Sequence, residues 1–289
     1  MHYEGHMIRP PSEAYSILLQ ATVGCSHNKC TFCGAYKGER FKIKPDEIID
    51  ADIAFAAAHC RHQRRLFICD GDAIIIPQKR LLRIVQSIHH RLPWVTRVGV
   101  YANTKSIRMK SAEELATLHA NGLGIAYMGV ESGDDSTLAA VRKGANAQGM
   151  IDAGRKLRQA GIKLSITVLL GVAGVQRSMV HAQETGRVIS AIDPEYVGAL
   201  SLMLIPGTAL YDDYQAGRFE LLSPEAMLQE LGVMIACTEM SGGLFHANHA
   251  SNYLPLKLNM PADKAHALDL IDRALKGEIQ LKPEAMRAL

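Results

Sequence analysis

This sequence has few aromatic residues, no strong net charge and no long apolar run. Aromatic residues make up 6% of the 289 residues, and the formal net charge is +3. A charge this small gives no reason to expect binding to nucleic acid or to a charged membrane surface. The longest apolar stretch, residues 164–175, is shorter than the roughly 20 residues that a membrane-spanning helix needs. These absences point away from nucleic-acid partners and from membrane insertion.

The sequence also lacks a secretion signal, because residues 1–15 contain no basic region followed by an apolar one. We therefore expect a cytoplasmic protein. Cysteine is scarce, with six in the chain, and in a reducing compartment these should remain thiols. A tight cluster of such thiols indicates metal binding before it indicates disulfides. With 48% hydrophobic residues and no low-complexity tract, the chain can build a sizeable core.

Short apolar runs alternate with helical stretches over the first two thirds of the chain. Predicted strands cover residues 15–24, 65–72, 96–104, 124–132, 162–171 and 195–205. Predicted helices cover residues 45–59, 78–92, 111–122, 146–160 and 178–192. Six such units predict a parallel sheet covered by helices, as in an α/β protein. We expect a partial (β/α)6 barrel of the TIM type, and a doubly wound open sheet is the alternative because the pattern fits both.

The pattern changes after residue 206. Two further helices are predicted at residues 223–240 and 261–276, and the segment between them, residues 245–256, is rich in His and Asn. We therefore expect two parts, a partial-barrel domain over residues 1–206 and a helical C-terminal extension over residues 207–289. The extension is our candidate for a lid over the active site.

Three of the six cysteines, Cys25, Cys30 and Cys33, fall within nine positions directly after the first predicted strand. In barrel-type α/β folds the loops at the carboxyl ends of the strands form the catalytic face. A structural zinc site usually takes four ligands in two separated pairs, and here only His27 could join the triplet as a fourth. Three cysteines on a [4Fe–4S] cluster would leave one iron open for another ligand. We expect the iron–sulfur cluster and keep zinc as the alternative.

The triplet, with Phe32 just before its last cysteine and six βα units around it, resembles the radical S-adenosylmethionine (SAM) superfamily. The resemblance runs from about Tyr15 to Tyr211. The spacing here is C-x4-C-x2-C, with one residue more in the first gap than the commoner C-x3-C-x2-C of the superfamily. Later segments resemble the branch that includes oxygen-independent coproporphyrinogen III oxidase and the methylthiotransferases.

Four later motifs extend this resemblance, and each lies at the end of a predicted strand. They are "CDGD" (69–72), "YMGVESGDDSTLAAVRKG" (127–144), "ITVLLGVAG" (166–174) and "SLMLIPGTALY" (201–211). At the first position the superfamily holds the methionine ammonium of SAM with backbone groups and an acid. Residues 70–72 keep a glycine for close backbone approach and an acid for an ammonium.

The resemblance assigns further roles along these motifs. Glu131 would bind the ribose hydroxyls, with Ser132 beside it, and Lys143 would pair with the cofactor carboxylate. The residues alone also allow Glu131 to cap the following helix and Lys143 to be a solvated surface charge. The implied SAM contacts, which also include adenine and ribose positions, are Asp70, Gly71, Asp72, Asn103, Glu131, Ser132, Lys143, Thr167, Gly171 and Leu204.

The resemblance also implies a reaction. In this superfamily a reduced [4Fe–4S] cluster passes one electron to SAM, and the 5′-deoxyadenosyl radical that forms abstracts hydrogen from a substrate. Two cofactors, the cluster and SAM, are therefore expected. The expected partners are a small or medium-sized organic substrate and a one-electron reductant such as flavodoxin or ferredoxin.

Four polar residues of the predicted lid are candidates for substrate contact, namely His246, Asn248, His249 and Asn252. Polar groups in an apolar segment either satisfy neighbouring backbone or recognise a ligand, and we weigh these two roles evenly. Metal binding by the two histidines is disfavoured because no acid or cysteine lies beside them.

Two other classes of function stay open. A non-catalytic iron–sulfur protein, either an electron carrier or a cluster donor, would also use clustered cysteines, although ferredoxin-type carriers use four. A zinc-stabilised barrel that binds a metabolite is the other alternative. The sequence does not identify the substrate or the product.

Overall fold

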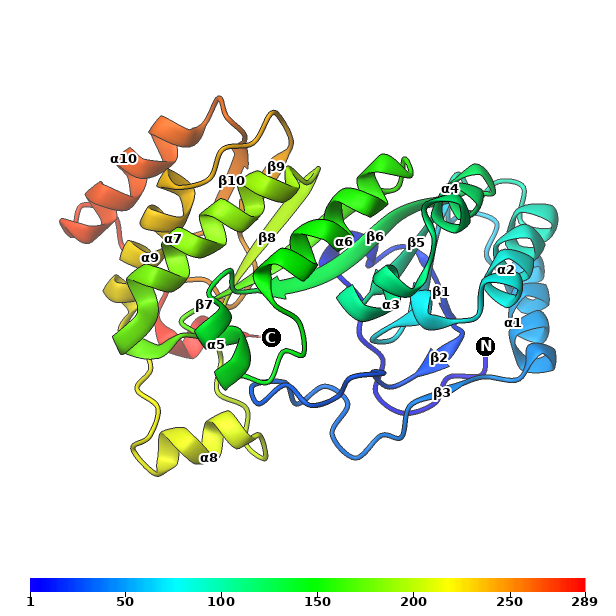
Figure 1. The fold of residues 1–289 in the computed structure, drawn as a ribbon, viewed down its shortest axis with the longest axis horizontal. Helices are drawn as coiled ribbons and strands as arrows, with labels where there is room; N and C mark the ends of the chain where they lie inside the picture. Colours follow the sequence, from blue (N-terminus) through cyan, green and yellow to red (C-terminus); the bar gives the residue numbers. More distant parts are fainter. Residues whose placement is uncertain (289) are drawn as a thin grey trace. The chain divides into compact units, whose positions relative to one another are not determined.

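The strands of the main sheet follow the order of the sequence (Figure 1). The computed structural model describes residues 1–288, and within them an eight-stranded sheet has the order β1-β4-β5-β6-β7-β8-β9-β10. The pairs β1–β4, β4–β5, β5–β6, β7–β8 and β8–β9 are parallel, and β9–β10 is antiparallel. A doubly wound sheet would reverse its order at a switch point, and this sheet does not. The predicted α/β class and partial barrel are confirmed.

Helices follow most strands, as the alternation in the sequence predicted. The strands are β1 (Ile17–Gln20), β2 (Thr22–Val23), β3 (Lys42–Ile43), β4 (Arg65–Cys69), β5 (Arg97–Ala102), β6 (Leu123–Glu131), β7 (Lys163–Leu170), β8 (Tyr196–Ser201), β9 (Leu244–Ala247) and β10 (Leu256–Asn259). The helices are α1 (Asp46–His59), α2 (Gln78–Arg91), α3 (Thr104–Met109), α4 (Ala112–Ala120), α5 (Asp135–Ala140), α6 (Ala147–Gln159), α7 (Gly174–Ile192), α8 (Ala209–Gln215), α9 (Pro224–Ala236) and α10 (Lys264–Leu275).

The C-terminal part differs from the sequence prediction in one respect. It contains the two expected helices, α9 and α10, and it also adds two strands to the sheet, which were not predicted. Each of these strands has only four residues, and β9 contains His246 between the apolar residues Phe245 and Ala247. Short strands of this kind form because a neighbouring strand offers hydrogen bonds, so their own sequence gives a weak signal. The extension is therefore mixed rather than purely helical.

The chain forms two compact units. The N-terminal unit comprises residues 1–28, 35–128 and 156–164, and the C-terminal unit comprises residues 29–34, 129–155 and those from 165 onward. In the N-terminal unit α1 packs against α2, and β4 contributes the fully buried Phe67 and Ile68 to the core. The rings of Tyr101 and Tyr127 meet Phe67 edge-on, with centroids 5.0 and 5.5 Å away. This geometry is favourable for aromatic pairs.

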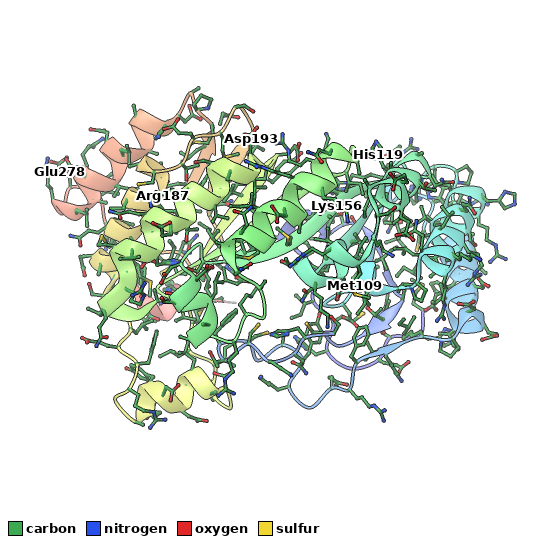
Figure 2. All side chains as sticks on the ribbon, viewed as in Figure 1. Met109, His119, Lys156, Arg187, Asp193 and Glu278 are labelled. Atoms are coloured by element: carbon green, nitrogen blue, oxygen red, sulfur yellow. The ribbon has the colours of Figure 1, made fainter. Side chains whose placement is uncertain are left out.

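In the C-terminal unit α9 packs against both α7 and α10. The exposed face of α7 carries charged residues such as Arg187, which is labelled in Figure 2. Asp193 follows the end of α7 in a left-handed conformation and accepts hydrogen bonds from the amide and the hydroxyl of Ser241, at 2.8 and 2.6 Å. These bonds connect the end of α7 to the segment before β9.

Over the part of the chain that the structure describes, no helix is both long enough and apolar enough to cross a bilayer. All six cysteines carry thiols rather than disulfides.

Candidate functional site

The cysteine loop follows β2 in the sequence. Cys25 belongs to the N-terminal unit, whereas Cys30 and Cys33 belong to the C-terminal unit, and each of the three is partly buried. The amide of Cys33 donates to the carbonyl of Cys30 at 3.4 Å, which marks a tight turn. Within this turn the Thr31 amide donates to the carbonyl of Val141, and the Thr31 carbonyl accepts from the amide of Leu210, both at 3.0 Å. Backbone bonds therefore hold the second half of the triplet.

Phe32, the aromatic residue before the last cysteine, has a packing role. It lies against a buried apolar cluster made of Val141, Leu169, Val172, Leu202 and Leu210. Leu204, a predicted adenine contact, packs against the same cluster. The segment between Cys30 and Cys33 is therefore held by apolar contacts as well as by backbone bonds.

Gly71, in the "CDGD" motif after β4, lies directly against Cys25. A Cβ atom at this position would be 2.7 Å from the Cys25 Cβ and 3.1 Å from the Tyr36 ring. The amide of Gly71 also donates to the carbonyl of Gly24 at 3.1 Å. We expected the motif to need a glycine so that another group could approach its backbone closely. In the N-terminal unit, the Cα and Cβ of Cys25 make this approach.

Asp72, from the same motif, joins the cysteine loop to the start of α3. Its fully buried carboxylate accepts from the hydroxyls of Ser26 and Ser106 and from the amide of Asn103, the last at 3.2 Å. Burial raises its pKa, and the hydrogen bonds from Ser106 and Ser26 oppose that rise. Asn103, a predicted ribose contact, uses its side-chain oxygen to cap α3 by accepting from the amide of Lys105 at 3.0 Å. This carboxylate thus links residues on three segments.

Asp70 is the second residue of the motif and is also fully buried. It accepts a hydrogen bond from Gln20 at 2.6 Å and one from the Tyr36 hydroxyl at 3.4 Å. Burial raises the pKa of Asp70 to about 6. Its backbone has φ of 75°, a left-handed conformation that Asp tolerates better than most residues. The motif therefore turns sharply as the chain leaves β4.

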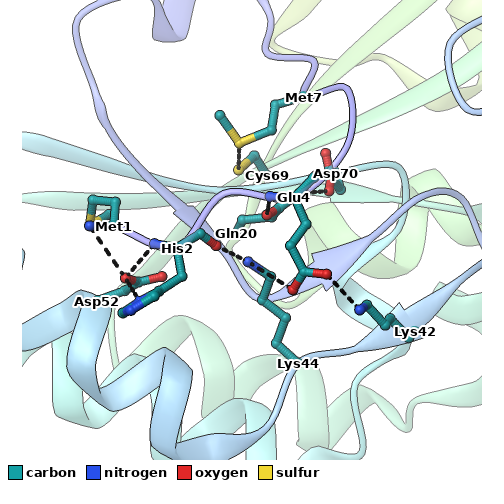
Figure 3. A network of polar contacts seen from close by, with 10 residues as sticks. All are labelled: Met1, His2, Glu4, Met7, Gln20, Lys42, Lys44, Asp52, Cys69 and Asp70. Carbon is teal, nitrogen blue, oxygen red and sulfur yellow. Dashed lines mark hydrogen bonds and ion pairs between the residues drawn. The ribbon is translucent and has the colours of Figure 1, made fainter. Parts of the chain in front are cut away.

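A polar network continues from Asp70 to the first residues of the chain (Figure 3). Gln20 also accepts from the Glu4 amide at 2.8 Å and donates to the Glu4 carbonyl at 2.7 Å. The buried ammonium of Lys44 donates to the carbonyl of His2, and the buried Asp52 accepts from the His2 amide at 2.8 Å. These bonds fix the first residues against β1 and α1, next to the segment that carries Asp70.

Glu131 and Lys143 form an ion pair in the C-terminal unit. Their side chains are 13% and 14% exposed, and Lys143 Nζ lies 2.9 Å from Glu131 Oε1. The helix after β6 is capped instead by Asp134, which accepts from the amide of Thr137 at 3.1 Å. The plainer interpretation, with Glu131 as the cap and Lys143 as a solvated charge, is therefore wrong. Two residues expected to bind opposite ends of one cofactor lie together in a mostly buried pair.

Ser132 and Gly171, two more predicted cofactor contacts, bind protein groups in the same unit. Ser132 is fully buried, and its hydroxyl lies 2.8 Å from His181 Nδ1. Gly171 has φ of 79°, and its amide donates to Glu230 Oε1 at 2.6 Å. Thr167 lies on β7, where it pairs with Gly198 of β8 and is partly exposed.

The profile of the radical SAM superfamily matches residues 19–182, which is more than half of the chain. The chain belongs to the radical SAM superfamily. Its cofactors are accordingly a [4Fe–4S] cluster and SAM, as the resemblance in the sequence implied.

Individual proteins are similar to this chain at low identity. The heme chaperone HemW of Bacillus subtilis (strain 168) is 21% identical over 191 residues, which cover 66% of this chain and 49% of that protein. Coproporphyrinogen III oxidase (HemN) from Escherichia coli superimposes with a TM-score of 0.55 at 15% identity, over 76% of this chain and 51% of that one. The methyltransferase TsrM from Kitasatospora setae superimposes with a TM-score of 0.56 at 15% identity, over 93% of this chain and 55% of that one. This chain spans about half the length of these relatives, and the structural likenesses support the fold alone.

The cysteine loop fits an iron–sulfur cluster in its chemistry. Three thiols are soft ligands suited to iron and sulfide, and Gly71 leaves the space beside Cys25 free of a side chain. Among residues 1–288, no three His, Cys, Asp or Glu side chains are grouped around a single ion position. A cluster does not need that grouping, because each cysteine binds a different iron.

The predicted substrate contacts of the extension differ in their surroundings. Asn252 is buried, donates to the Ala199 carbonyl at 2.7 Å and accepts from the Ser201 hydroxyl at 2.8 Å. Nδ1 of His249 accepts from the Ser251 amide at 3.2 Å, and burial lowers the pKa of His249. Burial also lowers the pKa of His246 on β9, and Asn248 is exposed. Asn252 therefore holds its own segment to the end of β8.

Sequence reasoning missed several residues of this site. Ser26, Gln20, His181 and Glu230 all bond to predicted cofactor positions or to their neighbours, and each comes from a distant segment. One signal was available for Glu230, since it lies between Met227 and Met234 on the buried face of α9. An acidic residue on an apolar helix face needs a buried partner.

Proposed function

We propose that this protein is a radical SAM enzyme that removes a hydrogen atom from an organic substrate. The observation that carries this proposal is the triplet Cys25, Cys30 and Cys33, in a loop after the first strands with "CDGD" packed against its first cysteine. Three protein thiolates would leave one iron of the cluster open to SAM.

In this proposal the three cysteines hold the cluster and the remaining motifs hold SAM. When bound, the reduced cluster supplies one electron that cleaves SAM to methionine and a 5′-deoxyadenosyl radical. Lys143 would bind the carboxylate of SAM and Glu131 its ribose hydroxyls. Their mutual contact at 2.9 Å supports these roles. In the absence of a ligand, each of these mostly buried charges compensates the other, and a bound ligand would replace this contact.

Residues on the other motifs would complete the cofactor site. Asp70, Gly71 and Asp72 would face the methionine ammonium, which suits their acidic and backbone groups. Asn103 and Thr167 would lie near the ribose, and Gly171 and Leu204 near the adenine. The apolar cluster that Leu204 joins supports a role as a wall rather than as a polar contact.

The part of the chain from residue 207 would act as a lid that excludes water from the radical. A reactive alkyl radical requires a dry site and a substrate held within contact distance. His246 and Asn248 are the better candidates for substrate contact, since the amide of Asn252 is occupied by β8. A small flavodoxin or ferredoxin would supply the electron.

Anaerobic reconstitution with iron and sulfide tests this function. We expect about four irons per chain, and 5′-deoxyadenosine after addition of SAM and dithionite. The protein without dithionite is the control. A protein that binds iron but forms no 5′-deoxyadenosine is a carrier or cluster donor, and one equivalent of zinc without iron identifies the zinc-stabilised barrel. Either result overturns the proposal.

A further inference from the structure

A buried glutamate from α9 binds the turn after β7. Glu230 is fully buried, and its two oxygens accept different donors. Oε1 accepts from the Gly171 amide at 2.6 Å, and Oε2 accepts from the Ser178 hydroxyl at 2.5 Å. Gly171 lies at the end of β7 and Ser178 lies in the first turns of α7, so one carboxylate holds both sides of the turn between these elements.

A buried histidine connects this glutamate to the turn after β6. His181 is fully buried, with Nε2 at 3.4 Å from Glu230 Oε1 and Nδ1 at 2.8 Å from the Ser132 hydroxyl. That hydroxyl also accepts from the Asp134 amide at 3.0 Å. Among the described residues Nε2 has no hydrogen-bond partner, so His181 meets Glu230 through close packing and meets Ser132 through the contact at Nδ1.

The carboxylate of Glu230 and the ring of His181 are costly to bury, so their presence in the core calls for an explanation. A fully buried carboxylate requires several hydrogen bonds to offset its desolvation, and an apolar residue at this place in α9 would avoid that cost. Fold stability alone gives no reason for a glutamate here. The two turns that it joins, however, carry Gly171 and the pair Glu131–Ser132, which are proposed contacts for the adenosyl part of SAM.

We propose that Glu230 and His181 are positioning residues that hold the turns after β6 and β7 in register for the adenosyl group of SAM. This inference rests on the proposed function. Glu230 fixes the Gly171 amide, and His181 packs between Glu230 and Ser132, the residue after Glu131. Neither residue needs to contact the cofactor. Loss of Glu230 therefore weakens SAM binding while the cysteine loop keeps its iron.

Substitution of Glu230 tests the inference with a conservative variant, a truncating variant and a matched control. Glu230→Gln keeps an oxygen for the Gly171 amide and offers an amide group to the Ser178 hydroxyl, whereas Glu230→Ala loses both bonds. Met234→Ala is the control, because Met234 is equally buried in α9 and has no bond to the Gly171 turn. Iron content, thermal unfolding and SAM affinity by anaerobic equilibrium dialysis are measured for each protein.

We expect Glu230→Ala to bind SAM roughly tenfold more weakly, since a charge-assisted bond to a backbone amide is lost, and Glu230→Gln to stay within about threefold of wild type. Iron content should be unchanged in both. Wild-type affinity in Glu230→Ala, or an equal loss of affinity in Met234→Ala, overturns the inference. Wild-type protein that does not bind SAM overturns the proposed function itself, which distinguishes the two failures.

A second measurement needs no cofactor and covers the case in which Glu230→Ala does not fold. Ser178→Ala removes one partner of Glu230 with little change in volume. Hydrogen exchange of the amides in residues 168–174, measured without SAM, should be faster in Ser178→Ala than in wild type, and SAM should bind about threefold more weakly. Unchanged exchange together with unchanged affinity overturns the inference.

Discussion

Two glycines make room for the functional groups at the scale of single residues. At Gly71 a Cβ atom would be 2.7 Å from the Cβ of Cys25. At Gly129 a Cβ atom would be 2.2 Å from Glu131 Oε1 and 2.9 Å from Lys143 Nζ. At distances this short, a side chain could be added at either glycine only if the neighbouring residue moved. Each glycine therefore protects one arrangement, Gly71 the path of the cysteine loop and Gly129 the ion pair.

Gly71→Ala should reduce the amount of cluster that the protein retains. The added methyl group meets the backbone and Cβ of Cys25, so the first cysteine must move. Iron and sulfide per chain, measured after anaerobic reconstitution and desalting, should fall to well below the wild-type ratio. Gly242→Ala is the matched control, because a Cβ atom at Gly242 meets no atom within 4 Å. Full iron content in Gly71→Ala would contradict this role.

Lys143→Ala should weaken SAM binding and leave the cluster intact. The variant removes the proposed partner of the SAM carboxylate and leaves Glu131 without the ion pair at 2.9 Å. We expect a loss of affinity of roughly tenfold or more, as for other charge-assisted bonds. Equilibrium dialysis gives the affinity and iron analysis the cluster content. Lys276→Ala, at an exposed lysine paired with Asp272, serves as control, and equal affinities in the two variants would remove Lys143 from the site.

At the scale of elements, side chains from distant helices secure the loops at the ends of strands. Asp134 caps α5, and it also accepts two bonds at 2.8 Å from Arg177 on α7. Near the end of the described chain, the buried Arg287 donates to the carbonyls of Ser251 and Leu202, at 2.6 and 2.9 Å. These strand-end loops are thus held by helices and by C-terminal residues rather than by their own sequence.

The Asp134–Arg177 pair should make stability depend on pH in the acid range. The Arg177 guanidinium holds the pKa of Asp134 well below its usual range. A depressed folded-state pKa contributes stability above the unfolded value, about pH 4, and this is lost as the pH falls toward the folded value. Urea unfolding should therefore show wild type more stable than Arg177→Gln at neutral pH, with the difference shrinking below about pH 4.

Arg187→Gln provides the control for this pH dependence. Arg187 lies on the same helix and is 68% exposed in its pair with Glu184. An exposed pair of this kind contributes little to stability. We expect this variant to follow the wild-type curve across the acid range. A constant difference between wild type and Arg177→Gln at every pH would contradict the role given to Asp134.

At the scale of the whole molecule, one cluster should account for all the iron. Of the remaining cysteines, Cys69 is fully buried with its sulfur 3.9 Å from that of Met7. Cys30→Ala should lose the cluster, since only two thiolates of the triplet remain. A variant with Cys60, Cys69 and Cys237 all changed to Ala should keep about four irons per chain. Electron paramagnetic resonance of the reduced proteins provides the second readout, and iron retained by Cys30→Ala would refute the ligand assignment.

Much of the architecture followed from local patterns in the sequence. Alternating apolar and amphipathic runs predicted the βα units, because burial on both faces gives a parallel strand its apolar composition. The pattern did not separate a partial barrel from a doubly wound sheet, since strand order is a property of pairing between distant segments. The short strands β9 and β10 were missed for the same reason, since β9 takes its hydrogen bonds from β8 and β10 takes them from β9.

The sequence by itself determined the family, through three cysteines in one loop and motifs in a fixed order. The spacing and order of such motifs can be read from the sequence without knowledge of the fold. Only the tertiary structure decided how these motifs are held. The bond from Gly171 to Glu230 spans 59 residues and the contact of Ser132 with His181 spans 49. Contacts at such separations come from the packing of helices on the sheet, which no local pattern encodes.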